Sequence, residues 1–480
     1  MKILVSGATG YVGSKLIPLL LDAGHEVTAM TRQELGKTDA ALNNVRFVTA
    51  DALRPGTLTK AVQGIDVAYY LIHSMAEAGG DFHQRDMTAA QNFATAARDA
   101  GVNRIIYLGG IVSNTSEVSK HLKSRQETGE TLRKFGPPMT EFRAGIIVGN
   151  GSLSFELIRC LTDRLPVMIC PRWVITRIQP IAIEDVLSYL LAALESEQSK
   201  GETIEIGGSS IETYRSMMLK YARARGLRRW LIRVPVLTPR LSSYWLRLIT
   251  PIPSSIARPL IEGLRTEVVC KSNLASEFFP AIRPVDYQAA IKKTLSRSLP
   301  DKAMKDALPS TPGHYFVRKD GILCDVRQVE TSASPHSLFS VLTRLGGADG
   351  YLYANRLWRI RGIFDRWIGG VGMKSAVNRT TLNANDSFDF WFVQEIEKDR
   401  HLVLRAAMKI PGRAWLEFAL DPQPNGKTLV RCFAWFEPRG LLGDLYWWGL
   451  YPVHILIFRG LVDALCTKAS AAAAVGTAIS

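Results

Sequence analysis

One short glycine-rich stretch near the start of the chain constrains the fold more than any other feature of the sequence. It reads Gly7-Ala8-Thr9-Gly10-Tyr11-Val12-Gly13, and it follows an apolar run, Ile3-Leu4-Val5, that is typical of a buried strand. Residues 14–21 then have the pattern of a helix. A Gly-x-x-Gly-x-x-Gly turn between a strand and a helix lets the backbone approach a pyrophosphate, and the helix N-terminus supplies unpaired N–H groups. We therefore predict that a dinucleotide binds at Gly7, Thr9, Gly10, Tyr11, Val12 and Gly13.

The first 150 residues alternate between strand-like and helix-like segments. Further strands are predicted at 26–32, 45–51, 66–72, 104–110 and 139–143 with 146–148, and helices at 81–100 and 120–134. Strands joined by helices imply right-handed crossovers and a doubly wound parallel sheet, which is a Rossmann-type α/β fold. Ligands of such sheets bind at the carboxyl ends of the strands. The residues predicted to lie there include Arg32, Asp51, Leu71, Ile72, His73 and Gly109.

Arg32 bears on which dinucleotide binds. It follows the predicted second strand, where an NAD enzyme usually presents an acidic residue to the ribose 2′-hydroxyl. An arginine can pair with a 2′-phosphate instead, so the sequence favours NADP(H) over NAD(H). Glu34, close by, keeps NAD(H) as an alternative, and an Arg32 side chain that only points to solvent is a third.

Length, cysteine content and the N-terminus limit the class of protein. A chain of 480 residues is long for one core, so we expect two or more domains. Its six cysteines are scattered without a C-x-x-C pair, which argues against a disulfide framework or a zinc site and fits a reducing cytoplasm. The sequence begins directly with a strand and has no signal-peptide pattern. We expect a cytoplasmic protein without a bound metal.

Residues 1 to about 295 resemble an atypical short-chain dehydrogenase/reductase of the subgroup whose turn reads G-A-T-G-x-x-G. Three later stretches carry the resemblance, at 51–66, 179–186 and 204–208. By this resemblance Asp51, with the adjoining Ala52, lies near the adenine. The stretch 69–75 reads Tyr-Tyr-Leu-Ile-His-Ser-Met and is similar to the signature of a bacterial subgroup that carries a second, C-terminal domain.

The expected catalytic pair of that family is altered in this chain. Ordinary members use Tyr-x-x-x-Lys, in which the tyrosine moves the proton while the lysine lowers its pKa and holds the nicotinamide ribose. Here His121 aligns with the tyrosine and Arg125 with the lysine. In one hypothesis His121 or His73 supplies the proton and Arg125 anchors the ribose. In the other, the site binds a dinucleotide and catalyses nothing.

Residues 151–300 are predicted to complete the substrate side of this first domain, with a helical cap at 210–295. The segment 223–271 is strongly basic, with ten Lys and Arg against Glu262 and Glu267, and its part 231–264 is rich in Pro, Trp, Leu and Arg. We favour a cap that closes an apolar substrate cleft. Peripheral contact with a membrane surface is the alternative, because basic and aromatic residues suit that interface. Binding to nucleic acid is not expected, since no recognisable motif accompanies the charge.

A linker at 301–313 precedes a second domain at 314–470. Its segments alternate between apolar and polar residues, which predicts antiparallel strands that form a curved sheet, followed by a long helix at 445–465. The most apolar run, 445–458, spans 14 residues between Asp444 and Arg459, whereas a membrane helix needs about 20. We expect a core helix first and peripheral membrane attachment second. The alanine-rich tail at 471–480 is predicted to be disordered.

The second domain resembles a domain of unknown function with a helix-grip architecture, of the START or polyketide-cyclase type. Such folds hold an apolar ligand between sheet and helix. Residues 356–361 and Asp365 belong to the resemblance; we expect Trp358 to pack the domain, and the role of the arginines stays open.

Together these features give two hypotheses of different classes. The first is an NAD(P)H-dependent oxidoreductase that acts on a hydrophobic carbonyl or quinone-like compound. The second is a dinucleotide-binding sensor or assembly protein without turnover. Either would lie in the cytoplasm or peripherally on the inner face of the membrane. The sequence makes no prediction of the oligomeric state.

Overall fold

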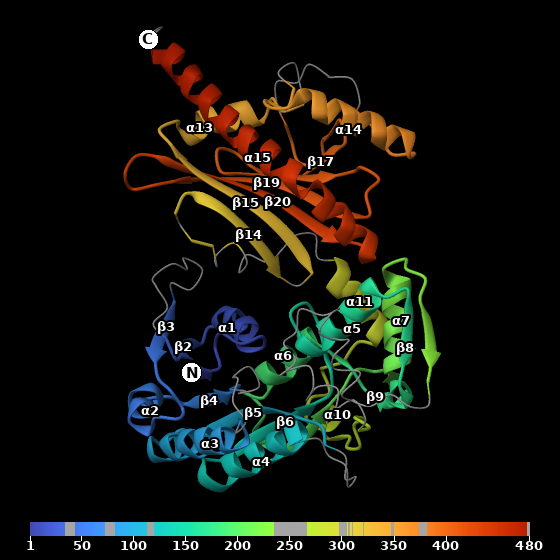
Figure 1. Cartoon of the computed structure of the whole chain (residues 1–480). Helices are drawn as coiled ribbons and strands as arrows, with labels where there is room; N and C mark the ends of the chain where they lie inside the picture. Colours follow the sequence, from blue (N-terminus) through green and yellow to red (C-terminus); the bar gives the residue numbers. More distant parts are fainter. Residues whose placement is uncertain are drawn as a thin grey trace. The chain divides into compact units, whose positions relative to one another are not determined.

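The structure is a computed structural model, and it describes most of the chain. The described residues are 1–33, 44–72, 82–112, 120–234, 266–296, 305, 308–309, 311–319, 321–346, 350–373 and 382–477. They fall into two compact units, Met1–Leu299 and Pro300–Ser480 (Figure 1). Each unit has hydrophobic core clusters of its own.

The first unit is built on a seven-stranded parallel sheet in the order β11-β6-β5-β4-β1-β2-β3. This order reverses between β1 and β4, which is the topological switch point of a doubly wound sheet. The predicted Rossmann-type fold is confirmed. The strands are β1 (Lys2–Ser6), β2 (Glu26–Thr31), β3 (Val45–Thr49), β4 (Val67–Tyr70), β5 (Arg104–Gly110), β6 (Met139–Ala144) and β11 (Thr203–Ile206).

Helices cover both faces of this sheet, as Figure 1 shows. On one face α1 (Gly13–Asp22) and α6 (Ile183–Ala192) share a core cluster, in which Leu16 and Leu20 meet Val186. The helices on the other face are α2 (Pro55–Val62), α3 (Phe82–Asp99) and α4 (Lys120–Phe135). Because the central strands are covered on both sides, they are apolar at successive positions, as Ile3-Leu4-Val5 are.

The remainder of the first unit packs around a third cluster. Its main helices are α5 (Leu153–Arg164), α7 (Tyr214–Ala224) and α11 (Tyr287–Ser296). The smaller elements are β7 (Ile147–Val148), β8 (Val167–Cys170), η3 (Arg172–Ile175), β9 (Arg177–Ile178), β10 (Ile181–Ala182), η4 (Glu197–Ser199), β12 (Glu212–Thr213), β13 (Trp230–Arg233) and α10 (Leu274–Phe278). The cap predicted over 210–295 thus shares its core with α5, which begins well before residue 210. Residues 235–265 of the predicted cap lie outside the described part of the chain.

The second unit contains a seven-stranded antiparallel sheet in the order β14-β15-β20-β19-β18-β17-β16. The predicted antiparallel sheet and long C-terminal helix are confirmed. The strands are β14 (Gly313–Lys319), β15 (Ile322–Thr331), β16 (Ser387–Phe388), β17 (Trp391–Glu397), β18 (His401–Ala406), β19 (Gly412–Pro422) and β20 (Thr428–Pro438). The helices are α13 (Pro335–Leu342), α14 (Asn355–Trp367) and α15 (Gly440–Thr477).

Helix α15 is longer than the sequence predicts. Expected over 445–465, it begins at Gly440 and continues to Thr477, through most of the tail predicted to be disordered. Alanine has the highest helix propensity, so the alanine-rich tail extends the helix. Within Gly440–Ala471 an 18-residue window reaches a mean hydropathy of 1.4, so this part of the helix is long and apolar enough to cross a membrane by length and composition. One side of the helix nevertheless packs on the sheet through Phe458, Leu461 and Leu465, as a core helix does.

Candidate cofactor site

The glycine turn joins β1 to α1 at the carboxyl edge of the parallel sheet. Gly7 has a φ of 70°, a conformation that residues with a side chain rarely adopt. A Cβ atom on Gly7 would lie 2.5 Å from the carbonyl oxygen of Leu71, and one on Gly13 would lie 2.4 Å from the carbonyl oxygen of Gly7. Both glycines are therefore required by the close approach of β1, α1 and the residue after β4.

Gly10 differs from the other two glycines because it is exposed. Its N–H donates to the Gly7 carbonyl at 2.9 Å, which closes the turn, and a Cβ atom there would meet only that carbonyl oxygen, at 3.0 Å. Thr9 is exposed as well, while Tyr11 and Val12 are half-buried. In the first turn of α1 the N–H groups of Ser14 and Lys15 donate to the carbonyls of Gly10 and Val12, at 3.0 and 3.1 Å. The exposed backbone at the N-terminus of α1 thus fits a pyrophosphate.

Asp51 and Ala52 lie directly after β3 and shape the loop into α2. The Asp51 carboxylate accepts a hydrogen bond from the Leu53 N–H at 3.0 Å, and the Asp51 N–H donates to the Thr57 hydroxyl at 2.9 Å. The buried Ala52 is held through its carbonyl oxygen, which accepts from the Asn92 amide at 2.9 Å. Arg32 follows β2 and is exposed. These three residues lie at the same edge of the sheet as the glycine turn.

Arg125 connects the ends of two central strands. One Nη atom donates to the carbonyl of Leu108 in β5, and the other lies 3.4 Å from the carbonyl oxygen of Ile72, just after β4. The guanidinium carbon also lies 5.1 Å from the centre of the Tyr107 ring. The sequence predicts that Arg125 anchors the ribose. Here its side chain reaches the predicted nicotinamide side, but two protein carbonyls already occupy part of its donor set.

The structure describes only some of the other residues predicted to lie on the nicotinamide side. Leu71 and Ile72 are half-buried behind the glycine turn, and Gly109 lies in β5, where a Cβ atom would lie 3.2 Å from the Tyr107 ring. His73 lies outside the described residues. His121 lies in the first turn of α4, and its side chain is outside the described part as well.

Three polar residues that the sequence analysis did not single out are buried near Arg125, and one of them, Tyr107, contacts it directly. The Tyr107 hydroxyl donates to the Arg125 carbonyl at 2.9 Å, and burial raises the pKa of Tyr107 to about 12. The Ser124 hydroxyl donates to the buried carboxylate of Asp86 at 3.2 Å. Asp86 lies on the same face of α3 as the buried residues Ala89, Ala90 and Phe93. An acidic residue on an otherwise apolar helix face is the sequence pattern that could have indicated this buried carboxylate.

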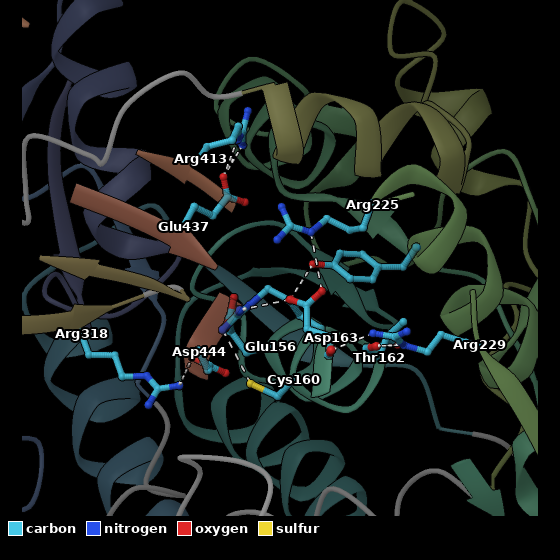
Figure 2. Close-up of polar contacts among 12 residues, drawn as sticks. Glu156, Cys160, Thr162, Asp163, Arg225, Arg229, Arg318, Arg413, Glu437 and Asp444 are labelled. Atoms are coloured by element: carbon cyan, nitrogen blue, oxygen red, sulfur yellow. Dashed lines mark hydrogen bonds and ion pairs between the residues drawn. The ribbon is translucent and has the colours of Figure 1, made fainter. Parts of the chain in front are cut away.

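A second polar cluster is buried in the cap, where it ties α5 to α7 (Figure 2). The Asp163 carboxylate lies 3.6 Å from both Arg159 Nη1 and Arg225 Nε, and it accepts from the Tyr221 hydroxyl at 3.3 Å. Arg229 donates to the Asp163 carbonyl at 2.8 Å. Arg225 and Arg229 belong to the basic segment 223–271, and the structure directs these two side chains into the protein. Figure 2 also draws two ion pairs of the second unit, Arg318 with Asp444 and Arg413 with Glu437.

Metal ligands do not gather anywhere in the described part of the chain. Within those residues, no three His, Cys, Asp or Glu side chains are placed to hold one ion. The six cysteines are all free thiols.

Comparison with known families divides the chain in the same way as its two cores. Residues 7–135 match a family described as NAD(P)H-binding, and residues 319–461 match one described as a protein of unknown function, DUF2867. The first unit thus combines a Rossmann-type fold with a match to an NAD(P)H-binding family over residues 7–135. Residues 319–461 of the second unit match a family to which no function is attached, and the helix-grip type stays a prediction.

Among curated relatives, 2-alkyl-3-oxoalkanoate reductase of Stenotrophomonas maltophilia is 30% identical over 112 residues, which are 22% of this chain and 32% of that protein. A (4-alkanoyl-5-oxo-2,5-dihydrofuran-3-yl)methyl phosphate reductase of Streptomyces griseus is 24% identical over 47% of this chain and 74% of its own length. The chain thus spans about a third of the first relative. The structure of an NADPH-dependent quinone oxidoreductase of Escherichia coli shares the fold, with a TM-score of 0.50 and 20% sequence identity. The match covers 61% of this chain and all of that one.

Proposed function

We propose that this protein is an NAD(P)H-dependent oxidoreductase with altered proton-transfer residues, which reduces a hydrophobic carbonyl or quinone-like compound. The observation that carries the proposal is the glycine turn, whose exposed Gly10 and helix N-terminus fit a pyrophosphate at the switch point of the sheet. The curated relatives named above are reductases of an oxoalkanoate and of an oxo-dihydrofuran, which supports the class of reaction.

The cofactor would be held along the carboxyl edge of the sheet. Gly7, Gly10 and Gly13 would bind the pyrophosphate, and Asp51 with Ala52 would lie on the adenine side. The exposed Arg32 would pair with a 2′-phosphate, so we propose NADP(H) in preference to NAD(H). The cofactor supplies the hydride when it is bound.

The protein's own part in the chemistry is to place the carbonyl compound and deliver a proton. We assign the proton to His121 or His73, since imidazole exchanges protons near neutral pH. Arg125 would hold the ribose with donors that the carbonyls of Ile72 and Leu108 leave free, and it cannot act as a base.

The decisive experiment has two parts. The nucleotide that copurifies with the protein is identified first, and NADPH oxidation is then measured against a panel of carbonyl compounds and quinones. We expect bound NADP(H), turnover with apolar substrates, and a loss of about 100-fold or more in kcat for His121→Ala. His25→Ala is the matched control, because His25 precedes β2 at the opposite, amino edge of the sheet.

Arg32 is tested separately. Arg32→Ser should weaken NADPH binding by about tenfold or more and leave NADH binding nearly unchanged, since only NADPH carries the 2′-phosphate. An equal effect on both nucleotides would remove the preference for NADP(H).

The second candidate is a dinucleotide-binding protein without turnover, a sensor or an assembly factor. The observation that favours it is the engagement of Arg125 with two backbone carbonyls, which is a structural role. Bound NADP(H) with no oxidation of any substrate, and no effect of His121→Ala, would establish this candidate and overturn the first.

For the second unit we propose a helix-grip architecture that holds an apolar ligand between the sheet and α15. The support is the arrangement of one long helix packed on a seven-stranded antiparallel sheet. Membrane contact through 223–271 stays a prediction. Co-sedimentation with anionic vesicles that is unchanged by charge reversal in this segment would contradict it.

A further inference from the structure

Helix α14 carries an apolar face that points away from the protein. One side of this helix is buried, where Trp358 stacks on Tyr351 and Phe390 with ring centres 4.8 and 5.9 Å apart. The opposite side consists of large apolar residues spaced three or four apart, which places them in one stripe. Their exposed fractions are 39% for Leu357, 62% for Ile360, 70% for Ile363, 54% for Phe364 and 81% for Trp367. The solvent-facing side of an ordinary surface helix is polar, whereas that of α14 is largely apolar.

The exposed charges of α14 are all positive. Arg356, Arg359 and Arg366 are exposed beside the apolar stripe. The one acid of the helix, Asp365, is fully buried, and its carboxylate accepts from the N–H groups of Gly372 at 2.9 Å and Lys409 at 2.7 Å. The outer side of α14 therefore presents tryptophan, aliphatic residues and arginine, with no exposed carboxylate in the helix to balance the arginines.

The first turns of α15 extend this surface. Arg361, on the flank of α14, donates to the Tyr446 hydroxyl of α15 at 3.2 Å, and both helices contribute to one core cluster. Opposite its buried side, α15 exposes apolar residues again, to between 39% and 72%: Leu441, Leu442, Leu445, Trp448, Val453 and Leu456. Beyond Leu456 the exposed positions turn polar, beginning with Arg459 and Asp463. The apolar exposure is thus confined to the turns near α14.

We propose that α14 and residues 441–456 of α15 form a docking surface for an anionic lipid bilayer. Contiguous exposed apolar residues mark an interaction surface. Tryptophan and arginine suit the membrane interface, where the arginine stem lies along the apolar layer and its head meets lipid phosphates. A second copy of the chain fits less well, because a two-fold contact through α14 would bring arginines together without acids to pair them.

The protein lies on the bilayer in this proposal and does not span it. The inner side of α15 is occupied by the sheet, since Phe458, Leu461 and Leu465 belong to the core cluster. Only the exposed side chains of α14 and of residues 441–456 in α15 would enter the headgroup region. The surface contains none of the residues assigned to cofactor or proton transfer, so it is independent of the proposed enzymatic function.

Vesicle co-sedimentation of the full chain tests the proposal. We expect the protein to bind vesicles of phosphatidylcholine with phosphatidylserine, and to bind pure phosphatidylcholine more weakly. Ile363→Ser with Trp367→Ser should lower binding to the anionic vesicles by about tenfold or more, because it removes two exposed anchors. Arg356→Ala with Arg359→Ala should reduce the preference for anionic lipid. Ile211→Ser, which removes another exposed apolar residue outside this surface, is the matched control and should bind as the wild type does.

Three results would overturn the proposal. The first is a wild-type protein that binds neither kind of vesicle. The second is the double α14 variant binding like the wild type with an unchanged melting temperature. The third is a wild-type dimer that becomes a monomer in the double variant without any vesicle binding, since this would assign the surface to a second copy. Because NADPH oxidation should be unchanged in these variants, failure here is separable from failure of the proposed function.

Discussion

At the scale of single residues, the three glycines of the dinucleotide turn are needed for different reasons. Gly7 and Gly13 have no room for a Cβ atom against the neighbouring backbone, whereas Gly10 is exposed and a Cβ atom there would meet only the Gly7 carbonyl oxygen, at 3.0 Å. Substitution at the first two should therefore damage the fold, and substitution at the third should damage binding.

We expect Gly10→Ala to weaken NADPH binding by about tenfold or more, because the added methyl group would lie 3.0 Å from the Gly7 carbonyl oxygen and so displace the turn. It should lower the melting temperature less than Gly13→Ala, whose Cβ atom would lie 2.4 Å from the same oxygen. Isothermal titration calorimetry and thermal unfolding measure the two effects. Gly56→Ala is the control, since a Cβ atom on Gly56 in α2 meets nothing within 4 Å. Unweakened NADPH binding in Gly10→Ala would show that the cofactor does not approach the backbone here.

His454 makes the second unit sensitive to acid. Burial, with the positive charge of Arg361 beside it, lowers the pKa of His454 to about 4. The unfolded chain takes up this proton near pH 6.5 while the folded chain does not, so the folded state loses stability as the pH falls from about 6.5 to about 4. The loss from this group is about 3 kcal/mol at most.

The variant that tests this is His454→Phe, which keeps an aromatic ring against Trp447 and Phe458. Urea unfolding at several pH values should show a smaller fall in stability for this variant than for the wild type between pH 6.5 and pH 4. Parallel curves for the two proteins would mean that His454 is protonated in the folded state.

At the scale of elements, the packing of α15 depends on where its glycines lie. A Cβ atom on Gly443 would lie 2.4 Å from the carbonyl oxygen of Pro411, so the helix approaches the start of β19 closely at that turn. Gly449 lies six residues further along, and a Cβ atom there would meet nothing within 4 Å. The two positions form a matched pair within one helix.

Gly443→Ala should destabilise the second unit by about 1–3 kcal/mol through overpacking. Gly449→Ala should leave it unchanged or stabilise it by up to about 1 kcal/mol, because alanine is the better helix former. Chemical denaturation of the full chain measures both. Equal stability of the two variants would mean that α15 does not approach β19 as described.

At the scale of the whole molecule, the two units have separate cores, and only the first carries the proposed cofactor site. NADPH at 100 times its dissociation constant should stabilise the first unit by about 2.7 kcal/mol and leave the second unit's own transition unmoved. Differential scanning calorimetry with and without NADPH should therefore show one transition shifted upward by several degrees. An equal shift of the entire unfolding profile would contradict this, and Gly10→Ala, with binding weakened about tenfold or more, should reduce the stabilisation to about 1.4 kcal/mol or less.

The sequence alone determined the local architecture, because hydrophobic periodicity and turn chemistry are local properties. The glycine turn, the alternation of strands and helices, and the alternating strands of the second unit were all predictable from residue spacing. Glycine spacing with a strand before it also located the cofactor turn. The end of α15 was not predictable from the turn and breaker signals, since alanine extended the helix beyond them.

Only the tertiary structure decided what covers each face and what each buried donor contacts. The family resemblance aligns Arg125 with the lysine of the catalytic pair, but the carbonyls of Ile72 and Leu108 that it meets lie far from it in the sequence. Spacing likewise groups Ile360, Ile363 and Trp367 on one side of α14, and a local pattern would assign that side to the core. The fold buries the opposite side instead, because periodicity defines which residues share a face and only packing determines which face is covered.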